Sequence, residues 1–131
     1  MVTVTRLDDR GDERGASFAI PDRWRTFLGV PLDAHLTTLR PGHVRGNHYH
    51  VERREILIVL HDDAWSLYWD DGPETAPQRR RFAGMGAVLL EIPPLAAHAI
   101  VNEGAADLRI IGLSDGPYDP NAPDAYPRAL V

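Results

Sequence analysis

The stretch PGHVRGNHYHVERREILIVLH, residues 41–61, decides the fold and carries most of the chemistry of this chain. Short apolar runs bounded by Gly, Pro and charged residues are typical of β-strands. Successive side chains of a strand point to opposite faces, so His48 and His50 should point the same way and Tyr49 the other way. Glu55 opens the next apolar run. The stretch therefore predicts two imidazoles that converge, with a carboxylate nearby.

A second histidine segment, GAVLLEIPPLAAHAIVNEG at 86–104, places His98 among apolar residues. Imidazole nitrogen is a ligand for zinc, copper, iron and nickel, and three histidines plus a carboxylate form an ordinary metal-binding set. For a single inward histidine, the alternative is a hydrogen-bonded core residue. Together the two segments give four candidate ligands: His48, His50, Glu55 and His98.

The rest of the chain favours an all-β fold. Turn residues separate short apolar runs, which predict strands near 34–40, 47–51, 54–61, 64–70, 79–83, 87–92, 98–103 and 107–114. Eight short strands indicate an antiparallel sandwich or barrel, and favour a closed or nearly closed barrel. Residues 1–33 are expected to form an arm with a short edge strand and a helical turn, and residues 115–131 an extended strap over the barrel. The 131 residues thus predict a single domain with its barrel at 34–114.

Composition removes several classes of chemistry. The chain has no cysteine, which excludes disulfides, thiolate nucleophiles and iron–sulfur clusters, and all 14 of its basic residues are arginine. None of its serines lies in a Gly-x-Ser-x-Gly turn. A net charge of −5 argues against nucleic-acid binding. No apolar run approaches 18 residues, so we expect a cytoplasmic protein with no membrane partner. Histidines and carboxylates remain as the chemical inventory.

The two histidine segments resemble the paired motifs of the cupin superfamily. The first motif maps onto Gly42, His48, His50 and Glu55, with Asp62 where the family has glycine. The second maps onto Gly86, Pro93, His98 and Asn102, with one extra residue before the proline and Leu95 in place of glycine. These departures fall in turns. The resemblance implies a small cupin barrel, that is, a double-stranded antiparallel β-helix or jelly roll.

A closer resemblance is to the cupin domain of capsular polysaccharide enzymes that epimerise a UDP-4-keto sugar. It depends on RGNHYH at 45–50, IPP at 92–94 and DPNAPDAY at 119–126. It implies zinc on His48, His50, Glu55 and His98, a homodimer and a nucleotide-sugar substrate. A related resemblance, through DERG at 12–15, is to nucleotide-sugar ketoisomerases and 3,5-epimerases, which use histidines as acid–base groups without metal.

The leading functional prediction is a metal-dependent isomerase or epimerase of a keto sugar. Such a reaction needs a base, for which His43 is the first candidate, with Glu91, a tyrosine or a metal-bound hydroxide as alternatives. Arg45 has the planar fork that suits a diphosphate or carboxylate, against a surface ion pair as the other reading. Asn102 is a candidate substrate contact, although a structural hydrogen bond to a barrel loop is the favoured reading.

Two other functions remain open at this point. The same ligands with open coordination positions suit non-haem Fe(II), which would make the protein a dioxygenase-type cupin. Alternatively, the metal could anchor a small molecule in a non-catalytic binding protein. Zinc is the favoured metal, with iron, manganese and nickel as alternatives.

Overall fold

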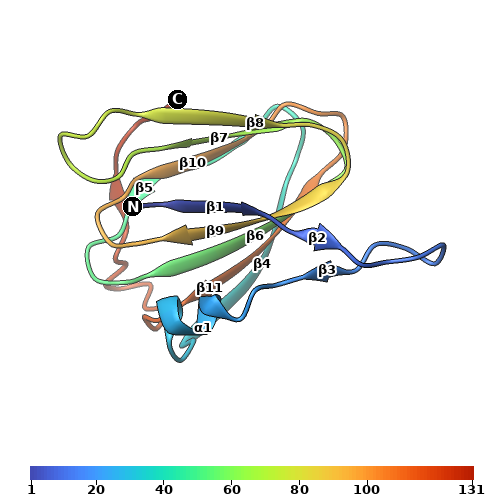
Figure 1. Ribbon diagram of the computed structural model, residues 1–131. Coiled ribbons are helices and arrows are strands. Elements are labelled where there is room, and N and C mark those ends of the chain that lie inside the picture. The colour runs from blue at the N-terminus through green and yellow to red at the C-terminus, as the bar shows by residue number, and fades with distance from the viewer.

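The computed structural model describes residues 1–131, and it consists almost entirely of antiparallel strands (Figure 1). The strands are β1 (Thr3–Arg6), β2 (Asp8–Asp9), β3 (Phe18–Ala19), β4 (Asp33–Leu39), β5 (Val44–Tyr49), β6 (Glu55–His61), β7 (Trp65–Trp69), β8 (Gln78–Phe82), β9 (Gly86–Ile92), β10 (His98–Asn102), β11 (Leu108–Ser114) and β12 (Tyr126–Pro127). One helix, α1 (Arg23–Leu28), lies between β3 and β4.

Two five-stranded sheets face each other. The first has the order β1-β9-β6-β11-β4 and the second the order β12-β5-β10-β7-β8, while β2 and β3 form a separate hairpin. Because β5 and β10 are neighbours in the second sheet, the two histidine segments of the sequence lie side by side. β6, which begins with Glu55, is the central strand of the opposite sheet.

The space between the sheets is filled by apolar side chains that follow the period-two pattern of the strands. Val88, Leu90 and Ile92 of β9 point inward and belong to a cluster of 13 buried residues that also contains Trp65 and Phe82, whose rings stack. This core reaches the histidines, since it contains Ile100 and Ile110, which line the same pocket as His48 and His98. Burial of that much apolar surface is the main stabilising contribution to a domain of this size.

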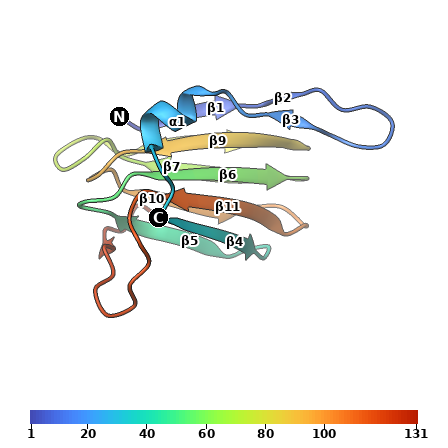
Figure 2. The same ribbon diagram turned by 90° about the horizontal axis from the view of Figure 1, so that it is seen from below.

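A second, smaller cluster lies on the outer face of the first sheet. Trp24, Phe27 and Leu28 of α1 pack there against alternate residues of β6 and β9, such as Ile56 and Leu89. Gly29 ends the helix with φ 73°, a conformation that favours glycine. Figure 2 shows α1 and the β2–β3 hairpin along this outer side.

The sequence located the strands well but not the closure of the sheet. All eight predicted strands are present, as are the edge strand near Val4, the helical turn after Pro21 and the extended C-terminal segment. No pairing joins β1 to β8 or β4 to β12, so the strands form two facing sheets and the predicted barrel closure is absent from the backbone hydrogen bonds. The all-β, antiparallel character of the prediction is confirmed.

The six-residue α1 is far too short to cross a bilayer, and the chain has no other helix.

Candidate metal centre

A bulge in β5 determines which side chains reach the site. His98 of β10 pairs with His48, but the next residue, Ala99, pairs with Gly46, which leaves Asn47 as an extra residue on β5. Asn47 has φ 55° and Gly46 has φ 103°. A Cβ on Gly46 would lie 2.5 Å from the carbonyl oxygen of His98, so only glycine fits where the two backbones approach. The Gly-Asn pair of the sequence is therefore the signal for the bulge.

The bulge brings Arg45 to the same face as His48. In a regular strand, residues three apart point to opposite sides of the sheet. With Asn47 surplus, Arg45 pairs with Ile100, which lies on the inner face of β10 with His98. Arg45 and His48 consequently line one pocket.

The other two ligand candidates are set by turns at the same end of the sandwich. His98 begins β10 directly after the Pro93-Pro94 turn. In that turn Leu95 has φ 74°, a left-handed conformation that favours glycine, the residue that the cupin motif would have placed here. Glu55 begins β6 and lies across from both histidine strands.

The four predicted ligands come together. Their ligand atoms all lie within 4.8 Å of one another. Glu55 Oε1 is 3.2 Å from His98 Nε2 and 3.6 Å from His50 Nε2. The ring centroid of His48 is 4.8 Å from that of His98. Three imidazoles and one carboxylate therefore surround a single point.

The hydrogen bonding within this cluster fits a cation. His50 Nε2 and His98 Nδ1 are buried and have no hydrogen-bond partner. Buried polar atoms normally have one, because leaving them unpaired costs free energy. Three nitrogens and a carboxylate oxygen are also the donor types that zinc and its neighbours in the periodic table prefer.

Burial and mutual contact shift the pKa values in the cluster. Burial, reinforced by the charges of His98 and His50, lowers the pKa of His48 to about 4. Burial opposes the charge on Glu55, but contacts with His50 and His98 outweigh it and hold the pKa of that carboxyl far below its usual range. For His50 the same carboxylate outweighs burial and raises the pKa. His48 is thus neutral at neutral pH, the state that metal binding requires.

The His48 shift predicts how the metal-free protein responds to acid. A histidine whose pKa falls on folding binds fewer protons in the folded state, so its contribution to stability is lost as pH falls from about 6.5 towards 4. The free energy of unfolding should therefore fall between pH 7 and pH 4.5. After allowance for solvent screening, we expect this fall to be about 1–2 kcal/mol smaller in His48→Gln than in wild type. Urea unfolding at pH 7 and pH 4.5, with chelator present, measures it. His35→Gln, at an exposed histidine, serves as the control, and equal pH dependence in wild type and H48Q would contradict the prediction.

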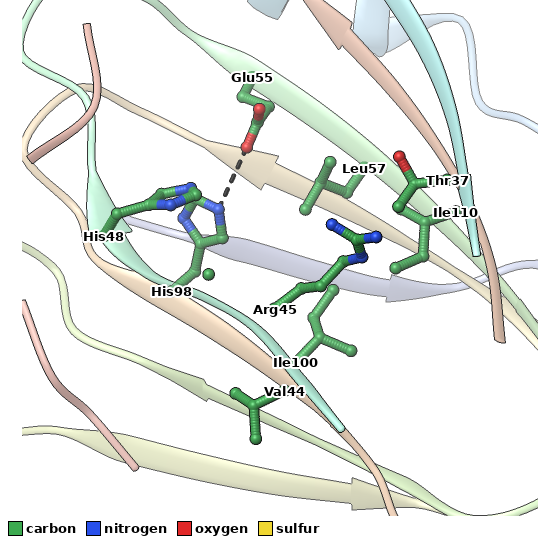
Figure 3. Close-up of a pocket in the computed structure, with 10 residues that line it drawn as sticks. Thr37, Val44, Arg45, His48, Glu55, Leu57, His98, Ile100 and Ile110 are labelled. Carbon is green, nitrogen blue, oxygen red and sulfur yellow. Dashed lines mark ion pairs between the residues drawn. The ribbon is translucent and has the colours of Figure 1, made fainter. Parts of the chain in front are cut away.

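The cluster lies at the inner end of a pocket of about 450 Å³ between the sheets (Figure 3). Leu57, Ile100 and Ile110 form its apolar wall. Arg45 extends along this wall, where its Nε donates a hydrogen bond to the carbonyl oxygen of Thr38 at 3.1 Å. Its terminal nitrogens have no protein partner, so they can bind an anionic group at the pocket.

Three predicted residues are not in this pocket. His43 is exposed and lines a neighbouring hollow with Arg40. Asn102 is buried: its Nδ2 donates to the carbonyl oxygens of Leu39 and Ala106, both at 2.8 Å. Glu91, an alternative base, points to the outer face, where it pairs with Arg23. His43 as base and Asn102 as substrate contact therefore gain no support from their positions.

The other two histidines, His35 and His61, lie outside the cluster and have other partners. His61 is buried and its Nδ1–H donates to the carbonyl oxygen of Gly84 at 2.6 Å. His35 is exposed and pairs with Asp33.

The sequence reasoning missed Asp124. Its carbonyl oxygen accepts a hydrogen bond from His50 Nδ1, and its carboxylate accepts bonds from three backbone N–H groups of residues 51–53. The motif DPNAPDAY contains this residue, but nothing in the local pattern indicates a partner some 70 residues away.

A model of the polysaccharide biosynthesis C-terminal domain matches residues 30–126. No curated protein sequence matches the chain significantly.

Three solved structures share the fold. The capsular polysaccharide assembling protein CapF from Staphylococcus aureus is 23% identical, with a TM-score of 0.66 over 93% of this chain and 34% of that one. A mutant of the 3,4-ketoisomerase QdtA from Thermoanaerobacterium thermosaccharolyticum, in complex with TDP-4-keto-6-deoxyglucose, is 17% identical, with a TM-score of 0.68 over 95% and 86%. The 4-keto-6-deoxy sugar epimerase NovW from Streptomyces spheroides is 20% identical, with a TM-score of 0.69 over 92% and 66%.

The chain spans only about a third of the length of CapF. The predicted resemblance to sugar-modifying cupins, and to those of capsular polysaccharide synthesis in particular, is confirmed. Since the matching model covers well over half of the residues, the chain belongs to the polysaccharide biosynthesis C-terminal domain family.

Proposed function

We propose that this protein is a metal-binding isomerase or epimerase of a keto sugar that is linked to a nucleoside diphosphate. The observation that carries the proposal is the cluster of three histidines and a glutamate at the inner end of a 450 Å³ pocket. A pocket of that size lies within the range of about 300–1,000 Å³ that small-molecule sites occupy. Ketoisomerases and epimerases of 4-keto sugars share the fold.

The metal would be held by His48, His50, Glu55 and His98, and zinc suits this set best. When bound, a divalent cation acts as a Lewis acid that favours negative charge on the carbonyl oxygen of the substrate. Isomerisation and epimerisation next to a ketone both need that charge to be stabilised.

The remaining pocket residues position the substrate. Leu57, Ile100 and Ile110 exclude water from one side of the sugar ring. Arg45 lies further out along the same wall and is the only cationic side chain of the pocket lining. We assign to Arg45 the binding of the phosphate groups of the substrate, because a guanidinium can bind a phosphate through two parallel hydrogen bonds.

Outside the cluster of three histidines and Glu55, the pocket contains no acid–base group. Apart from the cluster, its polar side chains are Thr37 and Arg45, and neither accepts a proton at neutral pH. With all four cluster side chains assigned to the metal, the lining offers no further side chain that could accept the proton in an isomerase reaction. The same observation favours a second candidate function, in which the pocket binds a sugar ligand without converting it.

Deuterium exchange separates these functions. The zinc-loaded protein is incubated in D₂O with TDP-4-keto-6-deoxyglucose or with a UDP-linked 4-keto sugar, and NMR spectra are followed. An isomerase or epimerase incorporates deuterium at the carbon beside the ketone, and chelator abolishes the exchange. A raised melting temperature without exchange would instead establish the binding function. Metal analysis of protein purified without added metal checks zinc, since stoichiometric iron would favour the dioxygenase.

Arg45→Ala should raise KM for the nucleotide sugar by about 10- to 100-fold, with a smaller effect on kcat. The reason is that a hydrogen-bonded charge pair contributes about 1.5–3 kcal/mol. If binding rather than turnover is observed, the same factor applies to Kd. Steady-state kinetics or calorimetry measures either one.

Arg109→Ala is the matched control, because this arginine is exposed on β11 and pairs with Asp62 away from the pocket. Arg45→Lys should recover part of the loss, since it keeps the charge but not the planar fork. An unchanged KM in R45A would remove Arg45 from the substrate site.

A further inference from the structure

We infer that the last part of the C-terminal strap, residues 124–131, supports the metal centre, with Asp124 as the residue that positions His50. The inference rests on the proposed metal site and adds a positioning residue to it. The strap lies on β5, where Tyr126 pairs with Tyr49 and Pro127 pairs with His48. It therefore runs directly beside two of the four ligands.

The carboxylate of Asp124 holds the loop that connects two ligands. It accepts hydrogen bonds from the backbone N–H groups of Val51 at 2.8 Å, Glu52 at 2.8 Å and Arg53 at 3.0 Å. These residues join His50 to Glu55 and belong to no strand. Without Asp124, three N–H groups of this loop would lose their partner. The spacing between His50 and Glu55 therefore depends on Asp124.

The backbone of Asp124 fixes the ring of His50. Its carbonyl oxygen accepts the hydrogen bond from Nδ1–H, which sets the tautomer and leaves the lone pair of Nε2 free. That Nε2 is buried, has no hydrogen-bond partner and faces Glu55 at 3.6 Å. A metal-binding histidine generally needs such a partner on its other nitrogen, and removing it typically weakens metal binding.

Contacts of the residues that follow Asp124 keep the strap in place. Arg128 Nη1 bonds both oxygens of the buried Asp70 carboxylate, each at 2.9 Å. The side chain of Asn47, the bulge residue next to His48, accepts from the N–H of Leu130 at 2.9 Å. Since the strap is anchored to the strand that carries the ligands, docking of the strap and binding of metal should favour each other.

The experiment compares Asp124→Ala with wild type in zinc and cobalt titrations of the chelator-treated full chain. We expect D124A to bind zinc about 10- to 100-fold more weakly, the range for residues that orient a metal ligand, because loss of the carboxylate frees both the 51–53 loop and the backbone carbonyl that accepts from His50. We also expect an altered cobalt absorption spectrum, which reports ligand geometry. Asp119→Ala is the matched control: it removes an exposed carboxylate of the same tail, whose hydrogen bond is local to Asn121. Wild-type affinity in D124A would overturn the inference.

A measurement on the wild type covers the case in which D124A does not fold. Metal should slow hydrogen exchange of the amides of residues 51–53 more than exchange in the β2–β3 hairpin, which lies far from the site (Figure 1). Equal slowing in both regions would also overturn the inference. If the wild type binds no metal, the proposed metal site itself fails. If it binds metal and D124A binds equally well, only the role of the strap fails.

Discussion

His98→Ala should lower the affinity for zinc by about 100-fold or more and leave the purified protein without stoichiometric metal. A structural zinc site contributes about 10–16 kcal/mol, so one of four ligands carries roughly 3 kcal/mol, or two powers of ten. His98 faces Glu55 at 3.2 Å and is the most deeply buried of the three histidines. Competition with a chromophoric chelator measures the affinity.

His43→Ala is the control for this change. It removes another imidazole, but an exposed one that lies outside the pocket, next to the end of β5 opposite His48. Circular dichroism and a melting curve establish that both variants fold. Full metal occupancy in folded H98A would disprove the ligand assignment, and loss of metal in H43A would show that the site extends further than the cluster.

Glu55→Gln should weaken zinc binding by a similar factor, because it removes the charge of the side chain and little else. Glutamine has nearly the shape of glutamate, so packing at the start of β6 is preserved while the only anion of the cluster is lost. We expect zinc to bind about 100-fold more weakly, by the same division of the binding free energy over four ligands. In the metal-free protein, the pKa of His50 should fall, because the Glu55 carboxylate is what raises it against the effect of burial.

NMR titration of the imidazole protons follows the second effect directly. Glu52→Gln is the control, since this carboxylate is exposed in the loop between two ligands and has no ion-pair partner in the cluster. A zinc affinity within about twofold of wild type in E55Q would exclude Glu55 as a ligand, whatever the histidines do.

Much of this site could be predicted from the sequence, because it depends on local periodicity. His48 and His50 are two apart on a strand, and His98 follows a proline turn of the kind that opens a strand. Such signals are short-range, so one sequence is enough to read them. They placed all four ligand candidates and seven of the strands to within about two residues, while β5 begins three residues earlier than expected.

The position of Arg45 could be proposed but not explained from sequence. Alternation counted back from His48 would put Arg45 on the opposite face. Only the register of β5 against β10 shows that Asn47 is surplus, which reverses the alternation. A bulge of this kind depends on contact between strands some 50 residues apart, which no local pattern determines.

The same limit applies to the residues that were placed incorrectly or missed. Asn102 has the side chain of a substrate contact, but its amide is used by two backbone carbonyls of neighbouring turns. Asp124 looks like a turn residue in a proline-rich tail, yet it bonds a loop more than 70 positions earlier. The prediction of a closed barrel failed for a related reason, because the number of strands does not determine whether the edge strands of the two sheets pair.

The surplus residue in β5 separates two tasks within a few ångströms of each other. Residues on the His48 side of Asn47 contribute imidazoles, and Arg45 on the other side would bind the anionic group of the proposed substrate. Because the two halves of the strand are out of phase, the outer half can change its length or composition without moving the inner one. Proteins with this strand could therefore change their specificity from one phosphorylated sugar to another through the Arg45 half of β5, while the histidine half that would bind the metal stays the same.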